Sequence, residues 1–264
     1  MDSIKSKTRL SSRDVTVRWL DAVSALEPAA WNALYPDRNP FMQHGFLSSL
    51  EDSGSATKDS GWTPRHLLLE QDQQPVAALP LYLKSNSYGE FVFDWGWAEA
   101  WQRYGLNYYP KLLTAVPFTP SVGPRLGTKA GADTRQLGAA ALDAVVAEVH
   151  SRDLSSWHLL FADEESRQRL QADSDKTQLL RRQDTQFHFL NPGFRDFDEF
   201  LMTLRASRRK NLRKERRKVS AQGVRMARYV GEDISPTDWQ AFYRCYVSTF
   251  MKRSGHAGYL TRAF

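Results

Sequence analysis

The stretch that most constrains the fold is a basic run, RASRRKNLRKERRK, at residues 205–218. It holds nine Lys or Arg residues and one acid, which exceeds the net charge of +6 of the whole 264-residue chain. Such a density of charge needs open water or an anionic partner. Directly before it, Phe197, Phe200, Leu201 and Leu204 recur at i, i+3, i+4 and i+7, which is typical of a helix with one buried stripe. We therefore expect one amphipathic helix with a core-anchored front end and a basic second half.

The composition indicates a globular protein in a reducing compartment. Hydrophobic residues make up 41% of the chain and aromatic residues 12%, enough for a real core. The single cysteine, Cys245, allows no intrachain disulfide and no thiolate-rich metal site, and no His pair suggests a metal. Residues 1–14 are polar, lack the apolar region of a secretory signal and are expected to be flexible. With no long apolar run for a membrane span, we expect a soluble, cytoplasmic protein without a metal.

Alternating strand and helix patterns predict a mixed α/β fold. Strands are expected at residues 90–95, 186–190 and 224–230, among others, and the clearest helix at residues 134–150. A turn at Asn191-Pro192-Gly193 indicates a domain boundary, so the first domain is placed at residues 15–190 and the start of a second at 191–264. A segment of about 70 residues is marginal for a core of its own. We therefore expect the natural protein to continue past Phe264; the alternative is a small subdomain that packs on the first domain.

Residues 135–140, RQLGAA, match the Gln/Arg-x-x-Gly-x-Gly/Ala pattern that acyl-CoA-binding N-acetyltransferases use to hold a pyrophosphate at a helix N-terminus. Gly138, however, lies several residues inside the expected helix. There it permits close packing of a neighbouring segment, and we favour this packing interpretation over a cofactor site.

An aromatic segment at residues 93–101, FDWGWAEAW, carries two acids among three tryptophans. Trp95 and Trp97 would form a stacking wall for a ligand, or else the rings fill an aromatic core. A carboxylate near apolar walls can have its pKa raised into the range of a general base. Asp94 is therefore the first candidate for a catalytic carboxylate and Glu99 the second.

The basic run allows three interpretations. It is a solvated face, a surface for nucleic-acid phosphates, or a site for a phosphorylated substrate or tRNA end held by arginine forks. Nine bases against one acid is too one-sided for a lattice of surface ion pairs, and no aromatic residue is present to stack on bases. We name Arg208, Arg209, Lys210 and Arg213 as substrate-binding candidates.

Several motifs together resemble one family, the bacterial Fem-like proteins labelled peptidoglycan biosynthesis/recognition, which belong to the N-acetyltransferase-like (GNAT) superfamily. The motifs are NPF at residues 39–41, FLSSLE at 46–51, FDWGWA at 93–98, YYPKL at 108–112, PFTP at 117–120, GPRL at 123–126, SRRKNLRKER at 207–216 and YLTRAF at 259–264. The resemblance implies two GNAT-like domains in tandem, the second incomplete. Fem proteins transfer amino acids from aminoacyl-tRNA to a peptidoglycan precursor, so the implied acyl donor is aminoacyl-tRNA or acyl-CoA. The degenerate phosphate loop disfavours acetyl-CoA.

These observations predict an acyltransferase of the N-acyl or aminoacyl type, acting on an anionic small molecule or a lipid-linked cell-envelope precursor. Asp94 or Glu99 would remove the amine proton or orient the amine, and Arg125 would hold a phosphate or carboxylate. The alternative is a non-catalytic protein that binds RNA or an anionic precursor through residues 205–218. A third interpretation is a truncated, inactive fragment.

Overall fold

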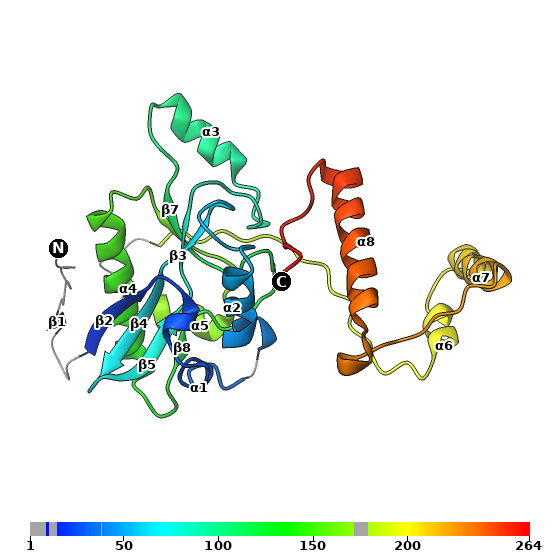
Figure 1. Cartoon of the computed structure of the whole chain (residues 1–264), viewed down its shortest axis with the longest axis horizontal. Helices are drawn as coiled ribbons and strands as arrows, with labels where there is room; N and C mark the ends of the chain where they lie inside the picture. The colour runs from blue at the N-terminus through cyan, green and yellow to red at the C-terminus, as the bar shows by residue number, and fades with distance from the viewer. Residues whose placement is uncertain (1–8, 11–14, 38, 172–178) are drawn as a thin grey trace. The chain divides into compact units, whose positions relative to one another are not determined.

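The computed structural model describes residues 9–10, 15–37, 39–171 and 179–264. These residues divide into two compact units (Figure 1). The first contains the described residues up to Leu179 together with Tyr246–Phe264, and the second is Leu180–Cys245. Of the predicted flexible N-terminus, only Arg9–Leu10 lies within the described residues, where it forms strand β1. The tandem GNAT-like domains with bounds at 15–190 and 191–264 stay a prediction.

Within the described residues, the first unit contains two β-sheets. The larger has five strands in the order β1-β2-β4-β5-β8, all antiparallel, and the smaller has four in the order β3-β6-β7-β9, with β7 and β9 parallel. Together with the helices this confirms a mixed α/β fold. The strands are β2 Val15–Leu20, β3 Trp62–Pro64, β4 His66–Gln71, β5 Gln74–Leu79, β6 Tyr82–Lys84, β7 Lys111–Thr114, β8 Gly127–Thr128 and β9 Trp157–Leu159.

Local sequence explains the central hairpin. Strands β4 and β5 are joined by Asp72 and Gln73, both with positive φ (47° and 63°). A two-residue loop with this geometry matches the twist of the flanking strands, so the hairpin forms locally. The apolar residues of β4 and β5 are buried on both faces of the sheet, because helices and loops cover each face.

The helices of the first unit enclose the sheets. Helix α4, Thr134–Ser151, packs on β4 and β5 and contributes Leu137, Ala141 and Val145 to the main core. The predicted packing interpretation of Gly138 agrees with the structure, because a Cβ built there would lie 2.2 Å from the backbone oxygen of Arg169. The remaining helices of this unit are η1 Val23–Ala25, α1 Pro28–Asn32, η2 Pro40–Met42, α2 His44–Asp52, α3 Trp95–Arg103 and α5 Glu164–Gln171.

A buried carboxylate ties α2 to both sheets. Glu51 Oε1 lies 2.8 Å from Nε2 of His66 on β4 and accepts a hydrogen bond from the Tyr82 hydroxyl on β6 at 3.1 Å, while Oε2 accepts from the Val23 N–H at 2.8 Å. The His66 Nδ1 accepts the N–H of Leu81. Both oxygens of Glu51 are therefore satisfied, as a structural buried acid requires.

The segment Tyr246–Phe264 packs against the first unit. Thr261 donates its hydroxyl to the Ser53 carbonyl at 2.8 Å, and its N–H to the Ser55 hydroxyl at 3.0 Å. The Tyr259 ring stacks on Phe118 with centroids 5.0 Å apart. This segment is the C-terminal part of helix α8, Pro236–Ser254, and the residues that follow it.

The second unit shows that the expected single basic helix is wrong. Helix α6, Phe197–Met202, ends at Thr203, and α7, Ala206–Ala221, begins after Arg205. The turn between them brings Arg213 to within 2.9 Å of Asp198, which a straight helix would keep about 22 Å apart at 1.5 Å per residue. A short 3-10 helix, η4 Gly231–Asp233, precedes α8.

Three expected strands are also wrong. Residues 186–190 and 224–230 are not strands; several of their apolar side chains, such as Phe187, are exposed, and they pair with no strand of the described chain. Of the expected strand at residues 90–95, residues 90–94 form an irregular loop and Trp95 begins α3, because Phe91 and Phe93 have positive φ values of 60° and 54° that a regular strand does not contain.

Candidate functional site

The first unit holds a buried polar centre on the smaller sheet. Lys84 ends β6 and Lys111 begins β7, and the two residues are direct partners across the antiparallel pair. Neither side chain has exposed surface. Like charges opposite one another are destabilising, so two buried lysines in this register require neighbouring acids. Those acids come from the loop that follows β6.

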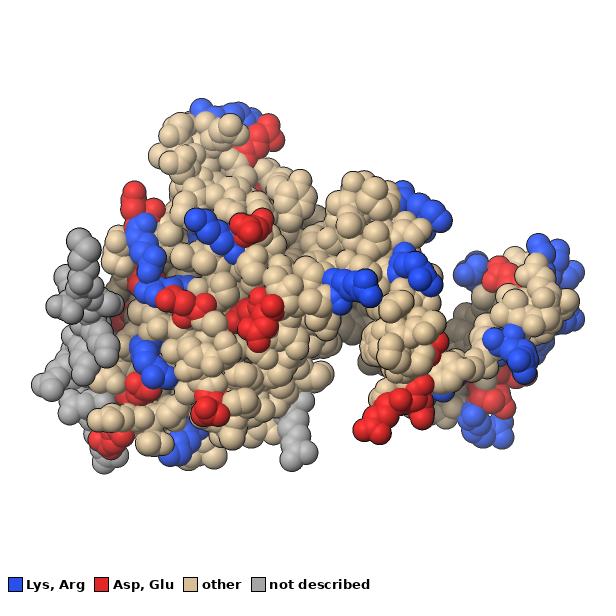
Figure 2. All heavy atoms as spheres, viewed as in Figure 1, with Lys and Arg blue, Asp and Glu red and all other residues tan. Residues whose placement is uncertain are grey.

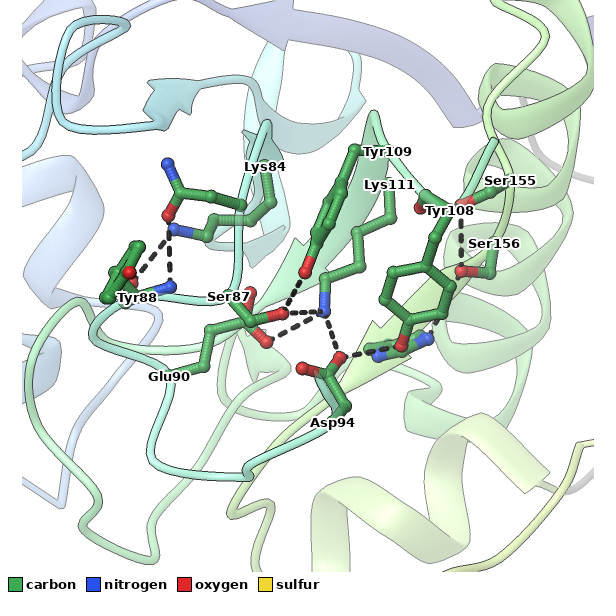
Figure 3. A network of polar contacts seen from close by, with 12 residues as sticks. Lys84, Ser87, Tyr88, Glu90, Asp94, Tyr108, Tyr109, Lys111, Ser155 and Ser156 are labelled. Carbon is green, nitrogen blue, oxygen red and sulfur yellow. Dashed lines mark hydrogen bonds and ion pairs between the residues drawn. The ribbon is translucent and has the colours of Figure 1, made fainter. Parts of the chain in front are cut away.

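The loop at residues 85–94 carries Glu90 and Asp94 over Lys111 (Figure 3). The Lys111 Nζ lies 2.8 Å from Glu90 Oε2 and 2.5 Å from Asp94 Oδ2. The Tyr108 hydroxyl donates to the same Asp94 oxygen at 2.6 Å. We call the group of Ser87, Glu90, Asp94, Tyr108, Tyr109 and Lys111 the acid–lysine cluster.

Each acid of the cluster keeps one oxygen without a partner. Glu90 is 3% exposed and Asp94 2% exposed, yet Glu90 Oε1 and Asp94 Oδ1 are buried and find no hydrogen-bond partner among the residues that the structure describes. Unsatisfied buried acceptors are rare and costly, since each forfeits its hydration. Two of them on neighbouring acids mark a place where a proton or a donor group from a ligand can be accepted.

The same loop turns its aromatic residues outward and its acids inward. Phe93 is 74% exposed and Phe91 38%, while Glu90 and Asp94 beside them are buried. Both phenylalanines also have the positive φ that costs a non-glycine residue about 1–3 kcal/mol. This arrangement opposes both hydrophobic burial and backbone preference, and such costs are typical of functional segments.

The environment separates the pKa values of the two acids. Burial alone would raise the pKa of Asp94, but the Lys111 ammonium and the hydroxyls of Ser87 and Tyr108 near the carboxylate outweigh it and lower the pKa to about 2. Burial raises the pKa of Glu90 above its ordinary value, despite the opposing effect of Lys111. Asp94 therefore stays ionised, and Glu90 is the better proton acceptor of the pair.

The pKa values of two bases nearby, Lys84 and His158, are both lowered. Burial lowers the pKa of Lys84 to about 7, although Glu90 opposes the change. Its Nζ donates to the Tyr88 carbonyl at 3.2 Å and lies 3.8 Å from the centre of the Trp62 ring. Burial and the charge of Lys111 lower the pKa of His158 to about 4, so this imidazole is neutral at physiological pH.

Of the carboxylates and tryptophans predicted from the sequence, only Asp94 lies in the acid–lysine cluster. Asp94 lies in the acid–lysine cluster, whereas Glu99 is exposed on α3 and pairs with Arg103 at 3.3 Å. Trp95 and Trp97 are exposed on α3, which stands away from the two sheets in Figure 1. Their predicted roles in catalysis or stacking stay predictions.

Arg125 is buried rather than presented to solvent. Its Nε donates to the Leu160 carbonyl at 3.1 Å and Nη2 to the Ser121 carbonyl at 2.5 Å. Burial lowers its pKa to about 10. Two of its donor groups thus hold loop carbonyls, and a substrate-binding role for Arg125 stays a prediction.

The basic candidates lie on α7 in the second unit. Arg213 pairs with Asp198, and Arg209 contacts the Met202 sulfur at 3.2 Å, so both side chains turn toward α6. Arg208 and Lys210 are exposed and form no ion pair within the described part of the chain. Figure 2 shows Lys and Arg side chains along the surface of this helix.

Sequence reasoning missed Glu90, Lys84 and Lys111. A lysine directly beside apolar residues was the available signal, since Lys111 is followed by two leucines and Lys84 is preceded by one. Their pairing across β6 and β7 is non-local, so the sequence alone does not bring them together. Within the described residues no three His, Cys, Asp or Glu residues gather into a metal site, and no helix is long and apolar enough to cross a membrane.

The fold and the cluster define a mixed α/β protein with a buried acid–lysine centre. A family model described as peptidoglycan biosynthesis/recognition, FemAB-like, matches residues 22–264, and the chain belongs to this family. The expected resemblance to Fem-like proteins is thus confirmed. A search of curated proteins finds no match. Among solved structures, a ribosomal-protein-alanine N-acetyltransferase from Brucella melitensis biovar Abortus 2308 is 10% identical, with a TM-score of 0.41 over 66% of this chain and 99% of that chain.

Proposed function

We propose that this protein is an acyltransferase that moves an acyl or aminoacyl group onto an amine of a cell-envelope precursor, with the acid–lysine cluster as its reaction centre. The observation that carries the proposal is the pair of buried acids, each with one unpartnered oxygen, beside two buried lysines. Membership in a peptidoglycan biosynthesis/recognition family supports the substrate class. A cytoplasmic location stays a prediction.

The residues divide the chemistry between them. Asp94, held ionised by Lys111 and Tyr108, orients the neutral acceptor amine by accepting a hydrogen bond from it on the free oxygen Oδ1. Glu90 takes the proton of the attacking amine on Oε1, because burial raises its pKa. The N–C bond forms, the bond from the acyl carbon to its carrier breaks, and the carrier leaves with the proton that Glu90 took from the amine. The Lys111 ammonium stabilises the negative charge that develops on the acyl oxygen.

The donor would be aminoacyl-tRNA or acyl-CoA, and a transfer assay tests both. The full chain is incubated with either donor and an amine-bearing stem peptide, and the acylated peptide is measured by mass spectrometry. We expect Glu90→Gln to reduce the rate by about 10²–10⁴-fold, the usual worth of a general base. Asp94→Asn should raise KM for the acceptor, whereas Asp143→Asn, exposed on α4, is the matched control. Unchanged transfer by Glu90→Gln and Asp94→Asn would remove the cluster from the reaction.

A second candidate function is the binding of an anionic polymer such as RNA by α7. At about 100° per residue, Lys210, Lys214, Arg217 and Lys218 fall on one side of the helix, and Arg209, Arg213 and Arg216 turn toward α6. The outward side has no acid and no large apolar side chain. It therefore suits phosphates better than a hydrophobic partner.

This candidate is tested by titrating labelled tRNA and an unrelated RNA at two salt concentrations. Replacing the four outward bases by Gln should weaken binding and flatten its salt dependence, since each lost phosphate contact lowers the slope by about 0.7–0.9. Replacing Arg208 alone should have a smaller effect. Equal binding of both RNAs without transfer would favour a non-catalytic protein; salt-independent binding would refute the phosphate interpretation.

A further inference from the structure

The acid–lysine cluster is closed in the structure. Lys111 has no exposed surface, and the side chains of Glu90 and Asp94 are 1% and 3% exposed. A substrate amine therefore cannot reach their free oxygens unless part of the wall moves. The segment that covers the cluster is the loop at residues 85–94, which supplies both acids.

The ion pairs of Glu90 and Asp94 with Lys111 hold one end of this loop, and the Tyr88 carbonyl fastens its middle to the smaller sheet. The Tyr88 oxygen accepts a hydrogen bond from Trp62 Nε1 at 3.1 Å and another from Lys84 Nζ at 3.2 Å. Both donors belong to the smaller sheet, Trp62 on β3 and Lys84 on β6. Next to it, Gly89 packs so closely beneath Phe118 that a Cβ would lie 2.5 Å from the ring.

The outer side of the loop carries two exposed aromatic residues on either side of Val92, which packs on the core. Phe91 and Phe93 are strained at positive φ, and the Phe91 ring meets the edge of Tyr259 with centroids 6.1 Å apart. Relief of this strain on opening would offset part of the cost of breaking the inner contacts. A closed state held by a few directed polar contacts, here the two ion pairs to Lys111 and the bonds to the Tyr88 carbonyl, over a strained backbone is typical of segments that open.

We propose that residues 85–94 form a gate over the acid–lysine cluster, and that the Tyr88 carbonyl, held by Lys84 and Trp62, is its latch. The gate rests on the proposed function in that it admits the acceptor to Glu90 and Asp94. Opening swings the two acids away from Lys111, and closing on an acceptor amine supplies donors to both free oxygens. Lys84 and Trp62 are positioning residues, because they act on the loop and not on the reacting atoms.

Exposure of the Lys111 amine measures the gate without any substrate. The full chain is treated with a lysine-acylating reagent, and labelling of Lys111 is followed by mass spectrometry beside amide exchange of β4 and β5, which reports global opening. Lys84→Met removes one latch donor and should speed Lys111 labelling about tenfold, the worth of one hydrogen bond. Gly89→Ala should do the same, because its Cβ collides with Phe118.

Gly105→Ala is the matched control. Gly105 has a φ of +72°, close to the +78° of Gly89, but a Cβ there meets nothing within 4 Å, so Lys111 labelling should stay at the wild-type rate. Wild-type rates in both Lys84→Met and Gly89→Ala, or labelling that rises only in step with exchange of β4 and β5, would overturn the gate. Faster Lys111 labelling in a protein that transfers no acyl group would refute the proposed function and leave the gate intact. Acyl transfer by the protein together with unaltered Lys111 labelling in both variants would refute the gate and leave the proposed function intact.

Discussion

Lys84 should give the protein a pH-dependent stability that one substitution removes. Burial lowers its pKa in the folded protein to about 7, from an ordinary value of 10.5 that the unfolded chain recovers. Between these values the unfolded state holds one proton more than the folded state, so the free energy of unfolding rises with pH. The slope is about 1.4 kcal/mol per pH unit, which amounts to about 2–3 kcal/mol between pH 7.5 and 9.5. Below pH 7 Lys84 is protonated in both states, so it no longer makes the free energy of unfolding depend on pH.

The assay is urea denaturation at pH 7.5, 8.5 and 9.5, followed by tryptophan fluorescence. Lys84→Met has nothing to titrate, so its unfolding free energy should lack this slope, while loss of the bond to Tyr88 shifts its level equally at each pH. Exposed Lys58→Met should keep the wild-type slope. The range stops below pH 10 because burial raises the pKa of Tyr108, and ionisation of the unfolded tyrosine then lowers stability as pH rises. Equal slopes for wild type and Lys84→Met would refute the reasoning.

Three further substitutions test the framework of the first unit by urea denaturation. Glu51→Ala leaves three buried donors without an acceptor and should lower the free energy of unfolding by about 3–5 kcal/mol; a loss below about 1 kcal/mol would contradict this. Gly138→Ala forces a Cβ against the Arg169 backbone and should destabilise by about 1–3 kcal/mol, whereas Gly96→Ala, in open space on α3, should be neutral or stabilising. Arg125→Met should cost about 2–4 kcal/mol if its guanidinium serves the fold; unchanged stability with weakened substrate binding would favour the predicted binding role.

The elements that the sequence predicts well are those decided by local patterns. Helix α4 matches its predicted bounds to within one residue, because its apolar spacing and the Asp133 cap both act within a few residues. The expected strands at residues 186–190 and 224–230 had the apolar pattern of a strand. A strand also needs a hydrogen-bonded partner strand, and the residues of the segment itself do not determine whether one is present. The expected basic helix failed for a related reason: its turn is held by an ion pair between residues 15 positions apart, Arg213 and Asp198.

The candidate site was predicted only in part. Asp94 could be found because an acid among three tryptophans stands out in the sequence. Lys111 and Lys84 could not be assigned, since a lone lysine in a short strand usually lies at an edge, and only the register of β6 against β7 places the two opposite each other. Glu90 could not be assigned either, because the loop buries this acid and exposes the neighbouring Phe91. That arrangement accompanies a positive φ at Phe91, which the sequence does not reveal.

The contrast between Glu51 and the acids of the cluster separates structural burial from functional burial within one chain. Both oxygens of Glu51 are hydrogen-bonded and link α2 to both sheets, so nothing is left for a ligand to satisfy. Glu90 and Asp94 are as deeply buried, but each leaves an oxygen unpartnered, on a loop that exposes Phe91 and Phe93 at strained φ. An apolar replacement of a buried ion pair is often neutral or stabilising, so stability alone does not explain these costs. They are explained if the missing hydrogen-bond donors arrive with the acceptor amine that the gate admits to the cluster.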